Sequence, residues 1–224
     1  MEQAGVDVGA APDYRVFRVG VLDTNCYLVW CTDTKHAVLI DPGESPEPAL
    51  AEAERLGLRI GCVLATHGHF DHVMGVNEVW ERADGVPFLL HPADHAMALA
   101  PSAQAEFVLG RPVPSVCPTG ALEDGQVIEF GRCRLRVIHT PGHTQGGVCL
   151  STDGMIFTGD TLFCGSVGRT DFEGGDWDQL MASIRDRLLP LPDDTLVLSG
   201  HGAATTIGEE RRQNPFLTDL TTEE

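Results

Sequence analysis

Short apolar runs alternate with longer amphipathic ones along most of the chain. Runs rich in Val, Ile, Leu and aromatic residues predict strands at 14–19, 25–30, 37–40, 60–65, 87–90, 127–130, 135–139, 148–151, 155–157 and 196–198. Helical periodicity, or a run dominated by Ala and Glu, predicts helices at 46–56, 73–82, 92–99, 176–188 and 207–213. The segment 100–120 holds four Pro and two Gly residues, so we expect a long loop that can include one helical turn. We interpret residues 1–224 as a single domain that ends in a short polar tail, 218–224.

Polar side chains that can bind metals follow the predicted strands. Asp41, His67, His143, Asp160 and His201 each lie just after a strand or in the loop that follows it. Side chains at the strand ends of a rigid sheet can converge on one rim while the strands stay buried. The pattern therefore predicts a polar site at one edge of the sheets.

The densest group of potential ligands is the run Thr-His-Gly-His-Phe-Asp-His at 66–72. Extended residues two apart point the same way, so His67 and His69 can hold one ion together. A turn that follows lets Asp71 and His72 reach a second ion. The run follows a buried strand, and no helix cap requires three His residues, so a purely structural role is disfavoured.

Three distant residues complete the two sets. His143 is the candidate for the first ion and His201 for the second. Asp160 can bridge both ions because a carboxylate has two oxygens. Spacing alone leaves these three assignments open. Imidazole and carboxylate ligands without thiolate suit Zn²⁺, Fe²⁺ or Mn²⁺. We expect two divalent ions, with zinc favoured and iron or manganese as alternatives. Such ions would share a water and make it a nucleophile, with Asp71 and Asp160 as the catalytic carboxylates.

Three further residues have two interpretations each. Asp41 precedes a proline, and it either forms a turn or holds a ligating histidine from behind by accepting its free N–H. Arg169 lies in a Gly-rich loop, and it either binds a substrate carboxylate or pairs with Asp171 or Asp176. Cys164 is expected to be a small buried hydrophobe rather than a redox-sensitive thiol.

The net charge and the cysteine pattern limit which binding partners and which cellular compartment we expect. The formal net charge of −18 disfavours nucleic acid and anionic membranes as partners. The seven Cys residues are irregularly spaced without a CxxC pair, which indicates neither disulfides nor a zinc knuckle. No apolar run approaches the ~20 residues of a membrane helix, and the N-terminus does not look like a signal peptide. We therefore expect a cytoplasmic protein.

Four segments together resemble the metallo-β-lactamase superfamily: Thr-His-Gly-His-Phe-Asp-His (66–72), Thr-Pro-Gly-His-Thr (140–144), Gly-Asp-Thr-Leu-Phe (159–163) and Ser-Gly-His-Gly (199–202). Within it they are similar to the glyoxalase II branch, the hydroxyacylglutathione hydrolases. Gly-Arg-Thr-Asp-Phe (168–172) and Asn-Pro-Phe-Leu (214–217) resemble the short bacterial members. The likeness extends over about residues 16–217.

The resemblance implies the α/β class, as a four-layer αβ/βα sandwich in which two mixed sheets are flanked by helices and the metals lie at the sheet edge. It supports one ion on His67, His69 and His143, a second on Asp71, His72 and His201, and Asp160 shared between them. It also implies no β-lactamase activity, since true β-lactamases lack the bridging Asp160. The C-terminal helical domain that supplies glutathione ligands in glyoxalase II is not expected. Arg169 matches a basic glutathione-binding position, whereas Asp171 stands where a Tyr is expected.

Two reactions are compatible with these ligands. The favoured one is hydrolysis of a thioester such as an S-2-hydroxyacylglutathione by a metal-bridging hydroxide, so the partner would be a small, glutathione-linked thioester. The alternative is a persulfide dioxygenase acting on glutathione persulfide, with one Fe²⁺ on His67, His143 and Asp160, a two-His-one-carboxylate set. An apolar surface left by the missing helical domain would suit a homo-oligomer.

Overall fold

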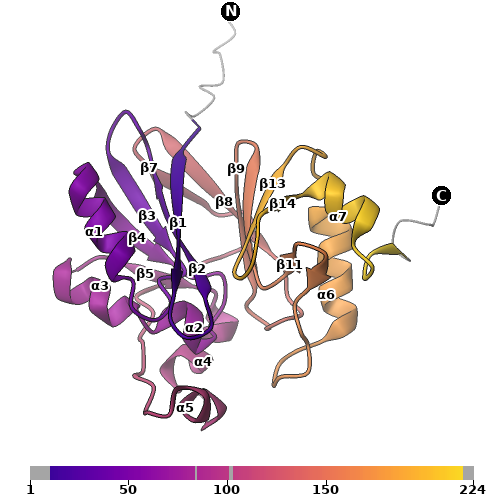
Figure 1. Ribbon diagram of the computed structural model, residues 1–224, viewed down its shortest axis with the longest axis horizontal. Coiled ribbons are helices and arrows are strands. Elements are labelled where there is room, and N and C mark those ends of the chain that lie inside the picture. The colour runs from indigo at the N-terminus through magenta and orange to yellow at the C-terminus, as the bar shows by residue number, and fades with distance from the viewer. Residues whose placement is uncertain (1–10, 84, 101–102, 219–224) are drawn as a thin grey trace, which may run out of the picture.

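The computed structural model describes residues 11–83, 85–100 and 103–218. Two six-stranded mixed sheets face each other, and helices cover the outer face of each, as Figure 1 shows. The first sheet has the order β1 (Asp13–Val19), β2 (Thr24–Trp30), β3 (His36–Ile40), β4 (Arg59–Leu64), β5 (Phe88–Leu90), β6 (Gly120–Ala121). The second has the order β14 (Thr205–Thr206), β13 (Leu196–Ser199), β10 (Met155–Gly159), β9 (Val148–Thr152), β8 (Cys133–His139), β7 (Val127–Phe130). The predicted αβ/βα sandwich is confirmed.

Three apolar layers hold the sandwich together. Tyr27 and Val29 point from β2 into the layer between the sheets, while Leu28 and Trp30 pack towards the helices of the first sheet. Because β2 is buried on both faces, its sequence is a nearly continuous apolar run. A third layer, around Leu180, joins the second sheet to its helices.

The helices of the first sheet come from its crossover connections. They are α1 (Glu47–Leu56), α2 (Phe70–Val73), α3 (Val76–Arg82), a 3₁₀ turn (Pro92–Asp94), α4 (His95–Leu99) and α5 (Ala103–Leu109). The second sheet is covered by α6 (Trp177–Ser183), which continues as a π-helical turn (Ile184–Leu188), and by α7 (Ile207–Gln213). A short ribbon, β11 (Leu162–Phe163) with β12 (Ser166–Val167), follows β10.

The predicted helix 73–82 is confirmed over Val76–Arg82 but is interrupted near its start. The chain instead forms α2 and α3, separated at Met74 and Gly75. The N–H of Gly75 donates to the carbonyl of Gly43, and a Cβ on Gly75 would lie 2.7 Å from Cδ of Pro46. The break therefore lets the backbone pack against the loop that follows β3.

The predicted loop 100–120 is also wrong in part, because α5 occupies Ala103–Leu109. Pro and Gly residues on either side of this segment hid a short run of good helix formers. Gly110, with φ of 64°, lies where the helix ends, a position that favours glycine.

Parallel pairing puts the functional loops at one edge. Strands β3, β4 and β5 are mutually parallel, and so are β10 and β13 in the second sheet. The loops after these five strands contain Asp41, the run 66–72, Asp94, Asp160 and His201. Their polar side chains consequently share one end of the sandwich.

Candidate metal centre

The run 66–72 is placed by the end of β4 and the start of α2. Residues 66–69 continue beyond the strand without helical structure, and α2 begins at Phe70. Asp71 and His72 therefore lie on the first turn of a helix, while His67 and His69 precede it. The predicted turn within the run is a short helix.

Three nitrogen atoms of the first predicted set lie close together. Nδ1 of His69 is 2.9 Å from Nε2 of His67 and 3.0 Å from Nε2 of His143. Three nitrogens on one tetrahedral ion with bonds of about 2.0 Å would lie roughly 3.3 Å apart. The separation is thus close to that of three ligands around a single cation.

The second predicted set converges beside the first. Oδ2 of Asp71 lies 3.4 Å from Nε2 of His72 and 3.3 Å from Nε2 of His201. Asp160 reaches both sets, because its Oδ2 is 3.7 Å from Nε2 of His143 and 3.7 Å from Nε2 of His201. Its Oδ1 is 3.5 Å from Nε2 of His72. The structure therefore brings all seven predicted ligands together.

Groups behind the histidines fix how the rings face. Nδ1 of His143 is 2.7 Å from the carbonyl of Arg169, and Nδ1 of His201 is 3.1 Å from the carbonyl of Leu22. Nδ1 of His72 is 3.1 Å from Oδ2 of Asp41. A hydrogen bond at Nδ1 leaves Nε2 as the free nitrogen that faces the centre.

Asp41 holds several of the groups that lie behind the histidines. It is buried, and its two oxygens accept the N–H (2.7 Å) and the hydroxyl (2.8 Å) of Thr66. The hydroxyl of Thr66 also lies 3.1 Å from Nδ1 of His67. Asp41 also has a φ of 50°, so it forms the strained turn before Pro42 as well as contacting His72. Both interpretations of Asp41 thus apply to the same residue.

The electrostatics around His67 and His69 favour neutral imidazoles. Burial lowers the pKa of His67 well below its usual value, and the neighbouring His72 lowers it further. Burial, followed by the charge of His143, lowers the pKa of His69 to about 3. Neutral imidazole is the form that binds metal ions.

The second set favours a positive charge. Burial alone would lower the pKa of His72, but Asp71, Asp160 and Asp41 outweigh it and raise the pKa to about 10. Burial alone would raise the pKa of Asp71, but His72 and His201 hold it well below the usual range. Three carboxylates around one imidazole create a negative potential that a cation would neutralise.

Two buried atoms of the centre have no hydrogen-bond partner among the described residues: Nε2 of His72 and Oδ1 of Asp160. Buried polar atoms without a protein partner are rare and are typical of positions that bind an ion or a water. Gly200 leaves space around both residues, since a Cβ there would meet Oδ1 of Asp160 and lie 2.7 Å from Cε1 of His72. The donor atoms, their charge and this space fit divalent cations.

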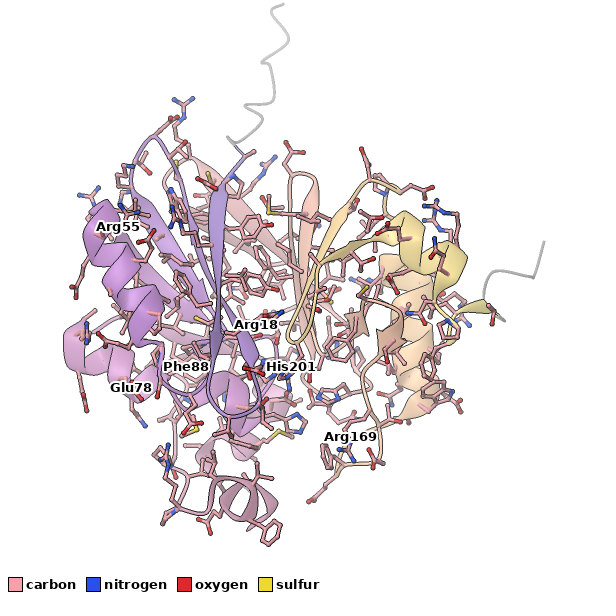
Figure 2. The ribbon with its side chains drawn as sticks, in the orientation of Figure 1. Arg18, Arg55, Glu78, Phe88, Arg169 and His201 are labelled. Carbon is pink, nitrogen blue, oxygen red and sulfur yellow. The ribbon has the colours of Figure 1, made fainter. Side chains whose placement is uncertain are left out.

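Arg169 lies beside the centre, on the loop that follows β12 (Figure 2). Its guanidinium makes two hydrogen bonds of 2.6 Å to Asp171 and lies 3.8 Å above the ring of Phe172. Phe172 in turn contacts the ring of His69, with 5.7 Å between centroids. The interpretation that pairs Arg169 with Asp171 matches the structure.

The expectation that Cys164 is buried is wrong. Cys164 is exposed, in the turn between β11 and β12, and all seven Cys residues are free thiols. The tight hairpin formed by these two short strands was not predicted, and it turns the residue outwards.

No helix within the described ranges is long and apolar enough to cross a membrane.

Sequence reasoning missed several supporting residues. Asn25 of β2 donates to the carbonyls of Ser199 (2.9 Å) and Gly202 (3.1 Å), so the first sheet holds the loop that carries His201. Asp94, after β5, contacts the loops of both His67 and His143 and is treated below. Asp94 follows a predicted strand at the same edge as Asp41, and that placement was the available signal.

An αβ/βα sandwich with a cluster of His and Asp side chains at its edge defines a metal-binding protein of the metallo-hydrolase type. The family model described as the metallo-beta-lactamase superfamily matches residues 19–201, and the chain belongs to that superfamily.

Among curated proteins, the chain is 38% identical over 213 residues to hydroxyacylglutathione hydrolase GloC of Haemophilus influenzae, covering 90% of this chain and 96% of GloC. It is 34% identical to the probable metallo-hydrolase YqgX of Bacillus subtilis, covering 91% of this chain and 97% of YqgX. Both relatives are therefore matched over nearly their whole length.

Solved structures give three further likenesses. The BLEG-1 B3 metallo-beta-lactamase has a TM-score of 0.86 at 37% identity, over 92% of this chain and 100% of BLEG-1. TTHA1623 in a di-iron-bound form has a TM-score of 0.81 at 41% identity, over 91% of this chain and 100% of TTHA1623. ETHE1 from Myxococcus xanthus has a TM-score of 0.75 at 30% identity, over 91% of this chain and 83% of ETHE1.

Proposed function

We propose that the chain is a metal-dependent hydrolase of a thioester such as an S-2-hydroxyacylglutathione. The observation that carries the proposal is the convergence of two complete donor sets joined by Asp160. The likeness to GloC supports the thioester substrate class. Zinc is the favoured metal, and the likeness to a di-iron-bound structure supports iron as an alternative.

Each candidate ligand of the centre has a proposed role. We assign His67, His69 and His143 to one cation, and Asp71, His72 and His201 to the other, with Asp160 shared. Two divalent cations held in this way would lower the pKa of a water towards neutrality and polarise the thioester carbonyl. Hydrolysis adds that water across the C–S bond and yields a carboxylic acid and a thiol.

Asp71 would act as a permanent anion in this scheme. The low pKa of Asp71 keeps the group ionised, so its role is to hold positive charge rather than to take up a proton. The free Oδ1 and the doubly placed Oδ2 support the assignment of Asp160 to both cations. Asp41 would hold His72 and, through Thr66, His67 in the required orientation.

Substrate contacts would come from two sides. Arg169 is the candidate for a substrate carboxylate, which would have to replace Asp171 as its partner. The exposed tip between β1 and β2 carries Val21 and Leu22, and the carbonyl of Leu22 lies 3.1 Å from Nδ1 of His201. These apolar side chains are candidates for contact with the acyl group.

A persulfide dioxygenase remains the second candidate. His143 and Asp160 approach each other at 3.7 Å beside His67, which supports a two-His-one-carboxylate iron site. The likeness to ETHE1 supports it as well. We favour hydrolysis because the second set, Asp71 with His72 and His201, is equally complete.

One comparison of metal content and reaction decides between the two. We expect about two ions per chain and hydrolysis of an S-2-hydroxyacylglutathione, measured by release of free thiol. One iron per chain with O₂ uptake on glutathione persulfide would instead support the dioxygenase. A chromogenic β-lactam serves as the third substrate, because BLEG-1 is described as a β-lactamase. Cleavage of the β-lactam alone would contradict the thioester proposal.

A further inference from the structure

The buried carboxylate of Asp94 connects two loops of the metal centre. Asp94 ends the 3₁₀ turn after β5 and is 1% exposed. Its Oδ2 accepts the N–H of Gly68 (2.9 Å) and the hydroxyl of Thr144 (2.7 Å), and its Oδ1 accepts the N–H of Gly146 (2.7 Å). Gly68 separates His67 from His69, and Thr144 follows His143 directly.

Two glycines allow this close approach. A Cβ on Gly146 would lie 2.6 Å from Oδ1 of Asp94, and a Cβ on Gly68 would lie 3.0 Å from Cβ of Asp94. Neither glycine has a positive φ, so backbone conformation does not require glycine at either position. Both positions instead make room for the Asp94 side chain.

The hydrogen-bonding pattern uses both carboxylate oxygens of Asp94 as acceptors. Three donors converge on two oxygens, and none of these contacts needs a proton on Asp94. An amide would present an N–H₂ group to at least one of these donors, whereas a carboxylate accepts all three. Replacing Asp94 by Asn therefore removes at least one link while the volume of the side chain is kept.

We propose that Asp94 is a positioning residue for the first donor set, His67, His69 and His143. Among the described residues, it belongs to none of the groups that could hold a metal ion, so it acts through the N–H of Gly68 and through Thr144. Asp41, directly after β3, holds the same loop at Thr66. Carboxylates that follow the two strands flanking β4 thus hold this loop at Thr66 and at Gly68.

The inference builds on the proposed function only in that this donor set holds a cation. Its consequence is that Asp94 sets the spacing between Nδ1 of His69 and Nε2 of His143, now 3.0 Å. Looser loops would lower metal affinity and change the coordination geometry. Residues behind metal ligands typically contribute about 10- to 100-fold to affinity or activity.

The experiment compares Asp94→Asn and Thr144→Val with two controls, using metal-free protein titrated with Co²⁺. Glu210→Gln is the matched control, because Glu210 is also buried and accepts from Gly165 (2.9 Å), Thr205 (2.7 Å) and Asn214 (2.7 Å). Thr144→Ser keeps the hydroxyl and should restore the wild-type result. Chelator competition gives the affinity, the visible absorption spectrum reports the Co²⁺ geometry, and circular dichroism checks the fold.

We expect Asp94→Asn and Thr144→Val to weaken Co²⁺ binding about 10- to 100-fold and to change the spectrum. For the loaded enzyme, kcat should fall with little change in KM. Glu210→Gln should lower Tm while affinity and spectrum stay at the wild-type values. If Asp94→Asn does not fold, the contrast between Thr144→Val and Thr144→Ser decides.

The inference would be overturned if folded Asp94→Asn bound Co²⁺ with an affinity within about twofold of wild type and an unchanged spectrum. If Asp94→Asn does not fold, the same result for Thr144→Val would overturn it. An equal loss of affinity in Glu210→Gln would overturn it too, because the effect would then be one of general stability. The titration needs no substrate. Wild-type protein that binds Co²⁺ but hydrolyses no thioester would therefore contradict the proposed function and leave this test valid, whereas no Co²⁺ uptake at all would contradict both.

Discussion

His72 lies where three carboxylates meet, and its protonation should govern the stability of the metal-free protein. Its pKa is raised to about 10, so the folded state keeps a proton that the unfolded state loses near pH 6.5. This stabilisation is fully present below pH ~6.5 and is lost as the pH rises towards 10. His69, with a pKa of about 3, acts in the opposite direction, because only the unfolded state takes up its proton as the pH falls below 6.5.

The Tm of chelator-treated protein should therefore fall on both sides of neutral pH. A change of about 1 kcal/mol shifts Tm by roughly 2–4 °C in a chain of this size. Protein saturated with Zn²⁺ is the control, since the cation replaces the proton on His72 and should remove most of the alkaline loss. A Tm of the metal-free protein that rises steadily from pH 5 to pH 9 would contradict this reading of His72.

The pair of Arg169 and Asp171 makes the substrate role of the arginine testable. The hydrogen bond from Arg169 lowers the pKa of Asp171 to about 2, so the pair stays charged at any working pH. If Arg169 binds a substrate carboxylate, Arg169→Ala should raise KM about tenfold with kcat nearly unchanged. Asp171→Asn should lower KM, because it removes the competing anion.

Steady-state kinetics on an anionic thioester measure both effects. Arg55→Ala is the matched control, because Arg55 is another exposed arginine paired with an acid, Glu52, and lies far from Arg169 in Figure 2. An unchanged KM in Arg169→Ala would remove the residue from the substrate site.

At the scale of elements, the metal centre depends on close packing between the loops that follow neighbouring strands. At Gly200 this packing leaves no room for a larger side chain. The loop after β13 brings Gly200 against Asp160 and His72, and a Cβ there would lie 2.7 Å from Cε1 of His72. Gly200→Ala should consequently displace one of these side chains and lower metal content and activity by at least about tenfold.

Gly61→Ala is the control for the loss of a glycine. Gly61 lies in β4, and a Cβ there would meet only the carbonyl of Ala37, at 3.8 Å. Metal analysis and thiol release should be unchanged in this variant. Full metal content in Gly200→Ala would show that the loop can yield, contrary to the close packing described here.

The convergence of the seven candidate ligands could be predicted from the sequence, because each follows a run that clearly predicts a strand. The run 66–72 is dense enough in His and Asp to indicate a candidate metal site, and parallel strands bring the distant residues to the same edge. For Asp94 the placement after a strand was a weak signal, because a single Asp there forms no motif and its partners are two backbone N–H groups and one hydroxyl. Likewise, α5 was hidden by the Pro and Gly residues that flank it.

Other features depend on contacts that a linear pattern does not encode. The rings of His91 and His139 stack with 4.3 Å between their centroids. His91 directly follows β5 of the first sheet, and His139 ends β8 of the second. The pairing of Arg169 with Asp171 was only one of two interpretations until the side chains were placed. The stacking of His91 on His139 is set by packing between distant segments, whereas the pairing of Arg169 depends on the side-chain conformation within one loop.

At the scale of the whole molecule, the centre joins the two halves of the sandwich. The first sheet supplies His67, His69, Asp71 and His72, while the second supplies His143, Asp160 and His201. A cation bound only by the folded state adds about 4 kcal/mol of stability when present at 1,000 times its Kd. Chelation should therefore lower Tm by roughly 10 °C.

Differential scanning calorimetry with and without chelator measures this effect. Adding Zn²⁺ back to the chelated protein should restore the original Tm, which serves as the control for irreversible damage. A Tm that is insensitive to chelator would mean that the two sheets are held without help from metal.

The central claim is that seven side chains hold two cations, with Asp160 between them. Anomalous diffraction from crystals of the metal-loaded protein tests this most directly, because it locates each ion independently of any activity. We expect two peaks about 3.5–4 Å apart, the first within bonding distance of His67, His69 and His143 and the second of Asp71, His72 and His201, with Asp160 contacting both. A single peak, or two peaks of which Asp160 contacts only one, would contradict the claim.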